Sequence, residues 1–283
     1  MLGAIIGDTI GSKFEFNNIY TEDFDLFSKK STYTDDTVLS VAVAEVLLYG
    51  GEYSDTIIKY ATTFKNRGYG GMFAQMIRTG KLTPYNSFGN GSAMRVSPVG
   101  WVHGTLKETL EEAKKSADCS HNHEEGVKGA QAVAGSVYLA RNGKTKEEIV
   151  AFVEALGYDL SKSTNQFPKK FDVTCQGTIP RCMAAFRETD DFEGAIRRTV
   201  SIGGDVDTNA AIVGSIAEAF YGGVPRDMVE EVYTRMPQPM ANIVTAFVKE
   251  HVDKDFVEPD EVGIDPLSDM YYDKGLFSSD YHV

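Results

Sequence analysis

The spacing of apolar residues constrains the fold most, because it is helical along nearly the whole chain. Apolar side chains recur at intervals of three and four residues within the segments 53–64, 106–117, 149–156, 228–236 and 243–248. Such spacing places them on one face of a helix. No convincing run alternates apolar and polar residues between hairpin turns, as a strand would. We therefore predict an all-α protein that folds as a compact single-domain orthogonal helical bundle.

Two further segments are apolar on more than one face. Residues 36–49 (DTVLSVAVAEVLLY) carry two charged side chains, and residues 209–221 (NAAIVGSIAEAFY) carry one. A helix that is apolar all round is buried among other helices. We predict that both lie at the centre of the bundle. Each begins directly after a cluster of aspartates, and this coincidence is the main indication of function.

Local sequence signals mark the starts of helices, a long loop and the end of the domain. Helices are predicted to begin at Ser54-Asp55, at Thr105 before Glu108, at Thr145 before Glu148 and at Pro225. Residues 159–173 have the composition of a long loop. We predict one domain over residues 1–255, followed by an acidic tail over 256–283 that is irregular or loosely packed.

Charge and cysteine content narrow the class of protein. The net charge of −13 comes mostly from residues 253–283, which contribute −7, and it argues against a sequence-independent grip on nucleic acid. The three cysteines are too few to form a disulfide framework that would stabilise a chain of this length. The N-terminal segment lacks a basic leader, and no apolar run reaches the ~18 residues of a membrane helix. We expect a monomer in the reducing cytoplasm, away from membranes.

The two aspartate clusters are Thr34-Asp35-Asp36-Thr37 and Gly203-Gly204-Asp205-Val206-Asp207-Thr208. One Asp or Thr at such a place is an ordinary N-cap, and the helix dipole favours a second acidic residue. Capping does not explain four carboxylates if the two apolar helices pack side by side. Their charges would repel in a medium of low dielectric constant, or the carboxylates would protonate. A bound cation removes the conflict.

The atoms offered to such a cation are carboxylate and Thr hydroxyl oxygens, which suit Mg²⁺, Mn²⁺ or Ca²⁺ better than Zn²⁺. An EF-hand is excluded, because Ala210 and Ile216 occupy the positions that need Gly and Glu. A zinc site at Cys119–His123 lacks a second half with matching spacing. Two metal ions that share a bridging aspartate are compatible with four carboxylates.

Two other segments are candidates for the site. Residues 89–95 (GNGSAMR) form a Gly-rich turn before a predicted helix, which is either an ordinary turn or a place where backbone N–H groups meet a phosphate. At the N-terminus, Gly3, Gly7 and Gly11 indicate close helix packing. Asp8 and Glu15 lie on this otherwise apolar segment. A buried Glu is costly unless it is paired or metal-bound, so Glu15 is a candidate fifth carboxylate.

Four motifs together resemble a known family. They are GAIIGDTIGSKFE near the start, TDDT before an apolar helix, GNGSAMRVSPVG midway, and GGDVDTNAAIVGSIAEAFYG late in the chain. In this order they are similar to the ADP-ribosylglycohydrolases, and they span residues 3–222. The resemblance implies an all-α fold with a cleft lined by two Mg²⁺ ions, or Mn²⁺. It also implies hydrolysis of the bond that joins C1″ of the distal ribose to an acceptor.

The resemblance assigns roles to individual residues. One metal would be held by Thr34, Asp35, Asp36 and Asp207, and the other by Asp205, Asp207 and Thr208. Catalytic roles would fall to Glu15, Asp36 and Asp207. Substrate contacts would come from Gly89, Asn90, Gly91, Ser92, Met94 and His121. The substrate would be an ADP-ribosylated protein or a small molecule that contains ADP-ribose.

Other functions remain open at this stage. The family includes non-enzymatic crystallins, so an ADP-ribose-binding module or a structural protein on the same fold is an alternative. Intact carboxylates in both clusters argue against each, because a non-catalytic chain has no need to keep repulsive charges together. A Mg²⁺-dependent phosphohydrolase is a more distant alternative. The sequence leaves open the acceptor group (arginine, serine, an O-acetyl group or another) and the stereochemistry at C1″.

Overall fold

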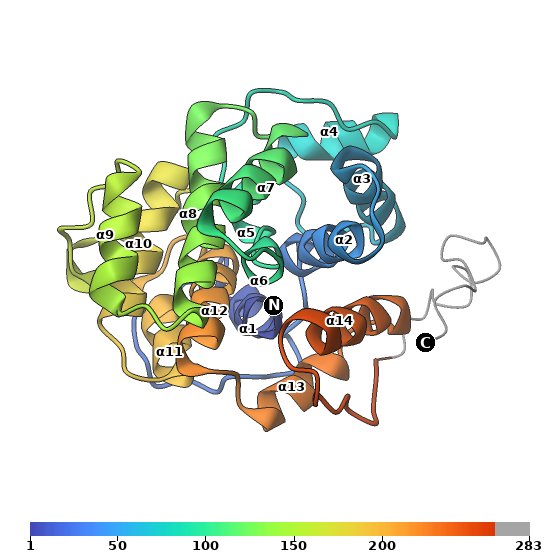
Figure 1. Ribbon diagram of the computed structural model, residues 1–283. Coiled ribbons are helices and arrows are strands. Elements are labelled where there is room, and N and C mark those ends of the chain that lie inside the picture. The colour runs from blue at the N-terminus through green and yellow to red at the C-terminus, as the bar shows by residue number, and fades with distance from the viewer. Residues whose placement is uncertain (264–283) are drawn as a thin grey trace.

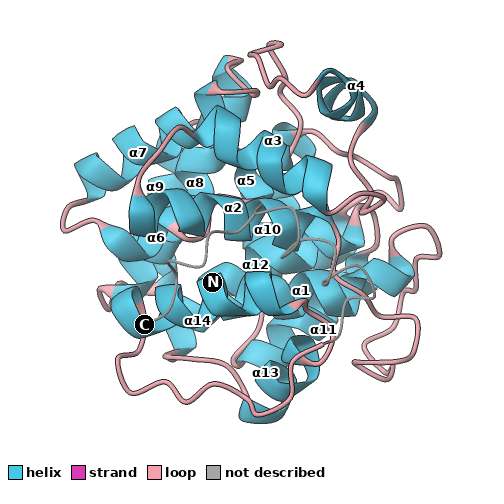
Figure 2. Cartoon of the chain, turned by 90° about the vertical axis from the view of Figure 1, so that its right-hand side faces the viewer, coloured by secondary structure: helices cyan, strands magenta, loops and turns pink. Residues whose placement is uncertain are grey.

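The computed structural model describes residues 1–263 and is built from helices, with no strand in that range (Figures 1 and 2). Four helices form the interior: α1 (Leu2–Gly11), α2 (Asp35–Tyr49), α8 (Glu124–Arg141) and α12 (Val206–Tyr221). The all-α prediction is confirmed.

The remaining helices surround this interior. The longer ones are α3 (Tyr53–Thr63), α4 (Gly71–Thr79), α7 (Leu106–Asp118), α9 (Lys146–Ala155), α10 (Cys175–Arg187), α11 (Phe192–Ile202), α13 (Arg226–Tyr233) and α14 (Gln238–His251). The short ones are α5 (Gly91–Met94), α6 (Val99–Val102), η1 (Ser12–Phe14) and η2 (Thr164–Gln166). None of the helices in residues 1–263 has the length and apolar character needed to cross a bilayer.

Burial confirms the two central helices. In α2 every residue from Asp36 to Val46 is buried, and in α12 every residue from Val206 to Ala219 is buried. All ten residues of α1 are buried as well. These buried stretches lack a solvent-exposed face, so the polar side chains within them depend on partners in the protein.

Helices α1 and α12 are in backbone contact, and Figures 1 and 2 show them side by side. A Cβ atom added to Gly3 would lie 2.1 Å from the carbonyl oxygen of Gly214, and one added to Gly7 would lie 2.0 Å from that of Ala210. One added to Gly11 would lie 2.5 Å from Cα of Asp207. The three glycines therefore set the distance between the helices, as the sequence predicts.

Most predicted helix starts agree with the structure. Capping boxes at Thr105 and Thr145 open α7 and α9, and Pro225 directly precedes α13. The start at Ser54-Asp55 is wrong by two residues, because Glu52 is the N-cap of α3. After α14, residues 252–263 form no helix, but Gly263 donates its N–H to the carbonyl of Tyr233 at 2.8 Å. Most of the predicted acidic tail, residues 264–283, lies outside the described residues.

Candidate metal centre and substrate cavity

The two aspartate clusters lie at the N-terminal ends of α2 and α12. Thr34 caps α2, since its hydroxyl accepts from the N–H of Asp36. Asp205 is in the N-cap position of α12, but its side chain makes no capping hydrogen bond. Asp36 and Asp207 follow in the first turns of these helices. Capping thus occupies one threonine and leaves the aspartates to be explained.

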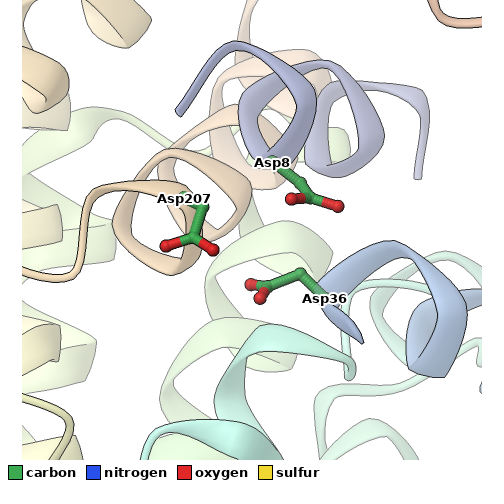
Figure 3. A group of neighbouring side chains, drawn as sticks. All are labelled: Asp8, Asp36 and Asp207. Carbon is green, nitrogen blue, oxygen red and sulfur yellow. The ribbon is translucent and has the colours of Figure 1, made fainter. Parts of the chain in front are cut away.

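Three carboxylates from distant parts of the chain converge at this point. Asp8 of α1, Asp36 of α2 and Asp207 of α12 point toward one another (Figure 3), and each offers an oxygen within 4.8 Å of the other two. A second group, formed by Glu15, Asp205 and Asp207, meets the same limit. Asp207 belongs to both groups. The arrangement therefore offers two adjacent cation sites with one shared carboxylate.

Asp8 differs from the others because the chain supplies it with donors. Its Oδ2 accepts from the N–H of Thr34 at 2.9 Å and from the N–H of Thr37 at 3.1 Å. The hydroxyl of Thr34 donates to Oδ1 at 2.8 Å, and that of Thr37 donates to Oδ2. These four bonds fasten the start of α2 to α1. Asp8 therefore orients Thr34 toward the cluster, a role that the sequence analysis did not assign to it.

Asp36 and Asp207 lack such compensation. Oδ1 of Asp36 and Oδ1 of Asp207 are buried without a hydrogen-bond partner among the described residues. The other oxygen of Asp36, Oδ2, accepts from the hydroxyl of Thr208 at 3.2 Å. An unpaired buried carboxylate oxygen is strongly destabilising unless a cation or a proton neutralises it. The two orphaned oxygens fit a bound cation.

The pKa values of the aspartates also show that their negative charges are poorly compensated. Burial, followed by the charge of Asp207, raises the pKa of Asp36 well above its ordinary value. Burial and then Asp205 raise the pKa of Asp207 well above its ordinary value. Burial raises the pKa of Asp8 and of Asp205 to about 6, although hydrogen bonds from Thr37 and Asn90 oppose the shift. Without a cation, the cluster retains protons that free aspartates lose.

Glu15 stands at the edge of the cluster, immediately after η1, and is only partly buried. Burial, and then the charges of Asp207 and Asp8, raise its pKa to about 8. It lies in the same cavity as the clusters. A carboxyl group in this place can exchange protons with a bound molecule as well as contact a cation.

Asn18 ties the Glu15 segment to the Asp205 loop. Its Nδ2 donates to the carbonyl of Glu15 at 3.0 Å and to that of Gly204 at 3.0 Å. The N–H of Gly204 donates back to Oδ1 of Asn18 at 2.7 Å. These bonds join the two segments that carry the second carboxylate group, although Asn18 and Gly204 are 186 positions apart in the sequence.

A cavity of about 520 Å³ opens directly above the carboxylates. The four aspartates of the two clusters line it, together with Thr208, the Gly89–Gly91 turn, Met94 and His121. Phe16, Phe88 and Phe171 stand at its exposed edge. The rings of Phe16 and Phe171 stack with centroids 6.1 Å apart. This volume and mixed lining are typical of a site for a small organic ligand.

The Gly-rich turn meets the second aspartate cluster through Asn90. Its Nδ2 donates to Oδ2 of Asp205 at 2.7 Å and to the hydroxyl of Thr178 at 3.1 Å. Two N–H groups of the turn are already used, because Gly89 donates to the hydroxyl of Ser87 and Asn90 to the carbonyl of Val173. Asn90 therefore orients a carboxylate, and the turn offers fewer free N–H groups than the sequence suggests.

The match to known proteins covers nearly the whole of the described chain. The family model described as ADP-ribosylglycohydrolase matches residues 1–254. The chain belongs to the ADP-ribosylglycohydrolase family. Both carboxylate groups and the lining of the cavity lie within these matched residues.

Individual relatives are distant. The chain is 24% identical to ADP-ribosylhydrolase ARH3 of Gallus gallus, over 78% of this chain and 84% of the relative. It is 26% identical to ADP-ribosylarginine hydrolase Tri1 of Pseudomonas putida, over 82% of this chain and 72% of the relative. A solved structure titled "ADP-ribosylglycohydrolase-related protein complex" superposes with a TM-score of 0.68 at 22% identity, over 88% of this chain and 96% of that chain. The last comparison shows that the fold is shared.

The structure brings most of the residues expected from the family resemblance to one place. Asp35, Asp36, Asp205, Asp207 and Thr208 line the cavity together with Glu15. Thr34 does not line it, but its hydroxyl lies next to Asp36 and donates to Asp8. Asp35 lines the cavity but belongs to neither close group, and Asp8 stands beside Asp36 and Asp207 instead. Ser92 does not line the cavity, because its hydroxyl is buried and donates to the carbonyl of Gly126 at 2.7 Å.

Proposed function

We propose that this ADP-ribosylglycohydrolase family member hydrolyses the bond at C1″ of an ADP-ribosyl group and releases ADP-ribose, with two divalent cations of the Mg²⁺ or Mn²⁺ type. The observation that carries the proposal is the convergence of Glu15, Asp36, Asp205 and Asp207 at the floor of the 520 Å³ cavity, with Asp207 close to the other carboxylates. Family membership supplies the substrate class.

The donor set fits such cations. It contains only carboxylate and hydroxyl oxygens, and two carboxylate oxygens, on Asp36 and Asp207, lack a partner in the described chain. Our assignment places Thr34, Asp35, Asp36 and Asp207 around one ion, and Asp205, Asp207 and Thr208 around the other. Asp8 has four donors already, so we assign it to hold Thr34 rather than to coordinate.

The chemistry requires a fixed ribose, a positioned water and stabilisation of positive charge at C1″ as the acceptor departs. When bound, divalent cations orient hydroxyl groups and lower the pKa of water. Glu15 lies where its carboxylate can take a proton from the attacking water. The Gly89–Gly91 turn, Met94 and His121 line the wall on which the ADP-ribosyl group rests. Asn90 keeps Asp205 in place through its amide.

The direct test is to incubate the chain with two separately prepared substrates, ADP-ribosyl-arginine protein and ADP-ribosyl-serine protein, and to measure released ADP-ribose. We expect release from at least one of them in Mg²⁺ or Mn²⁺ and none in EDTA. Release of AMP or phosphate instead would support a phosphohydrolase. Binding of ADP-ribose without release from any ADP-ribosylated substrate would support the non-catalytic alternative.

A further inference from the structure

Arg95 is a fully buried guanidinium that no carboxylate neutralises. It follows α5, is 0% exposed and forms no ion pair within the described residues. Its Nη2 donates to the carbonyl of Ser116 at 2.6 Å and to the hydroxyl of Ser120 at 2.9 Å. A buried charge of this kind is costly to keep and calls for an explanation from function or from packing.

The hydroxyl of Ser120 connects this charge to the cavity. Its Oγ lies 2.7 Å from Nδ1 of His121. A guanidinium can only donate, so Oγ accepts from Arg95, and its own hydrogen must find an acceptor elsewhere. Nδ1 of His121 is the acceptor within reach, since the other neighbour, the Cys119 thiol, is 4.0 Å away and is itself a weak donor. Oγ therefore donates to Nδ1.

The direction of this hydrogen bond determines the protonation of the other ring nitrogen, Nε2. When Nδ1 accepts, the ring proton of a neutral histidine resides on Nε2. Nε2 faces the Gly-rich turn, because a Cβ atom added to Gly91 would lie 3.0 Å from it and one added to Gly89 would lie 3.6 Å away. Nε2 has no hydrogen-bond partner among the described residues, and His121 lines the cavity.

The surroundings of His121 favour the neutral ring. Burial, and then the charge of Arg95, lower the pKa of His121 well below its ordinary value. The phenol of Tyr85 also faces the ring, with ring centroids 5.8 Å apart, and burial raises its pKa. The Cys119 thiol lies 4.0 Å from the hydroxyl of Ser120. No carboxylate in residues 1–263 forms an ion pair with the imidazole, so nothing there stabilises the imidazolium.

We propose that Arg95 and Ser120 are positioning residues that hold His121 in its Nε2–H form, as a hydrogen-bond donor aimed into the cavity beside Gly89 and Gly91. The acceptor would be an oxygen of the ADP-ribosyl group, and this part rests on the proposed function. His121 then binds substrate as a donor and does not act as the general base.

The test reads the proton positions directly. In the metal-free full chain labelled with ¹⁵N, the long-range ¹H–¹⁵N spectrum distinguishes a protonated from an unprotonated ring nitrogen, and the His121 signals are those lost in His121→Gln. We expect protonated Nε2 and unprotonated Nδ1 from pH 6 to pH 8. A wild-type ring protonated at Nδ1, or an imidazolium at pH 6, overturns the proposal whether or not Ser120→Ala folds.

Variants then show which residues fix the ring. Ser120→Ala removes the donor to Nδ1, so we expect a mixture of the two neutral tautomers. The matched control is Ser97→Ala, which deletes a buried hydroxyl that has no hydrogen-bond partner within residues 1–263 and lies two residues from Arg95. This control should keep the wild-type pattern. An unchanged pattern in Ser120→Ala overturns the positioning role.

Addition of ADP-ribose separates this inference from the proposed function. We expect the Nε2–H proton signal to move on binding, and Ser120→Ala to weaken ADP-ribose binding by about 3- to 10-fold, the usual worth of one hydrogen bond. Binding that leaves the Nε2–H signal unmoved overturns the donor role. Failure to hydrolyse any ADP-ribosylated substrate counts against the proposed function alone, because the tautomer is measured without substrate.

Discussion

The two ends of α12 treat buried carboxylates in opposite ways. At the C-terminal end, Glu218 accepts from the N–H groups of Leu2 at 3.2 Å and Gly3 at 2.9 Å, and it pairs with the amino group of Met1. At the N-terminal end, Asp207 lies close to Asp8 and forms no ion pair within residues 1–263. Both ends pack against the same helix, α1.

The two ends of α12 therefore have different roles: the carboxylate at one end stabilises the fold, and those at the other end belong to the candidate site. Glu218 caps the first turn of α1, and the chain itself supplies the compensating charge and donors. The carboxylates around Asp207 have buried oxygens that the described chain leaves without donors. Groups that destabilise a fold in isolation are concentrated at sites that bind or react. One end of this helix pair is therefore stabilised by its own charges and donors. The other end keeps negative charge that the described chain does not compensate.

The largest effect expected from this comparison is on activity. Asp207→Asn keeps the shape of the shared side chain but removes the charge that would serve both cation sites. We expect metal affinity and ADP-ribose release to fall by about 100-fold or more. The unfolding free energy of the metal-free protein should stay equal or rise, since one repulsive charge is gone. Activity assays, Mg²⁺ titration and urea unfolding in EDTA measure the three quantities.

The matched control is Asp191→Asn at the N-cap of α11, where the side chain accepts from the N–H of Gly194 and is exposed. Asn caps about as well as Asp, so this variant should keep both activity and stability. If Asp207→Asn behaves like Asp191→Asn at limiting Mg²⁺, Asp207 is an ordinary cap and the bridging assignment is wrong.

The opposite end of α12 gives the largest effect expected on stability. Glu218→Ala leaves the N–H groups of Leu2 and Gly3 and the amino group of Met1 without their buried acceptor. We expect a loss of about 3 kcal/mol in the free energy of unfolding. As a control, Glu230→Ala breaks a more exposed pair with Arg226 and should cost less than about 1 kcal/mol. Equal losses for the two variants would contradict the structural role of Glu218.

The pH dependence of the stability of the metal-free protein tests whether the carboxylates around Asp207 are uncompensated. Asp8 and Asp205 have pKa values of about 6 and Glu15 of about 8, all above those of free side chains. The folded state therefore binds more protons than the unfolded state between about pH 4 and pH 8, and stability falls as pH rises. We expect Tm in EDTA to fall by several degrees from pH 5 to pH 8.

Two variants show which residues cause this decrease of Tm with pH. Asp207→Asn should flatten it, because one of the interacting carboxylates is removed. Glu218→Ala should lower Tm throughout but leave the slope in place. Excess Mg²⁺ should raise Tm most at pH 8, where the carboxylates are ionised. A Tm that rises with pH in the metal-free protein would contradict the assignment of raised pKa values to the cluster.

The smallest effect concerns Asn18, which links the Glu15 segment to Gly204 without joining either carboxylate group. Asn18→Ala removes these bonds and should reduce ADP-ribose release by about 5- to 30-fold, equivalent to about 1–2 kcal/mol, through misplacement of Glu15. The exposed Asn142→Ala removes one side-chain bond to the Tyr138 carbonyl and serves as control. If both variants retain full turnover, the link does not position Glu15.

Much of the fold is predictable from the sequence because it depends on local signals. The uninterrupted apolar character of residues 36–49 and 209–221 identifies the central helices, and the four-residue spacing of Gly3, Gly7 and Gly11 identifies a close helix contact. Capping boxes at Thr105 and Thr145 mark helix starts. The start near Ser54 is missed because Glu52 occupies the cap position without a side-chain hydrogen bond, so it leaves no sequence signal.

The candidate site is only partly predictable, because its partners are distant along the chain. The pairing of Asp8 with Thr34 and Thr37 depends on how α1 and α2 meet. The amide of Asn90 reaches Asp205 across 115 residues. In retrospect, Asp8 carried a signal, as the one charged residue among the ten residues of α1. The direction of Ser92 toward Gly126 carried none, since a serine in a Gly-rich turn faces either way.

The contact between α1 and α12 also has a consequence for the order of events during synthesis. All ten residues of α1 are buried, mainly against a helix that begins about 200 residues later. At ribosomal rates of about 5–20 residues per second, α1 waits roughly 10–40 s for that partner. Throughout this time the face of α1 that packs on α12 lacks its partner, and both carboxylate groups lack Asp207. A nascent chain that ends before residue 221 therefore lacks the helix that buries most of α1 and cannot yet assemble the full set of carboxylates.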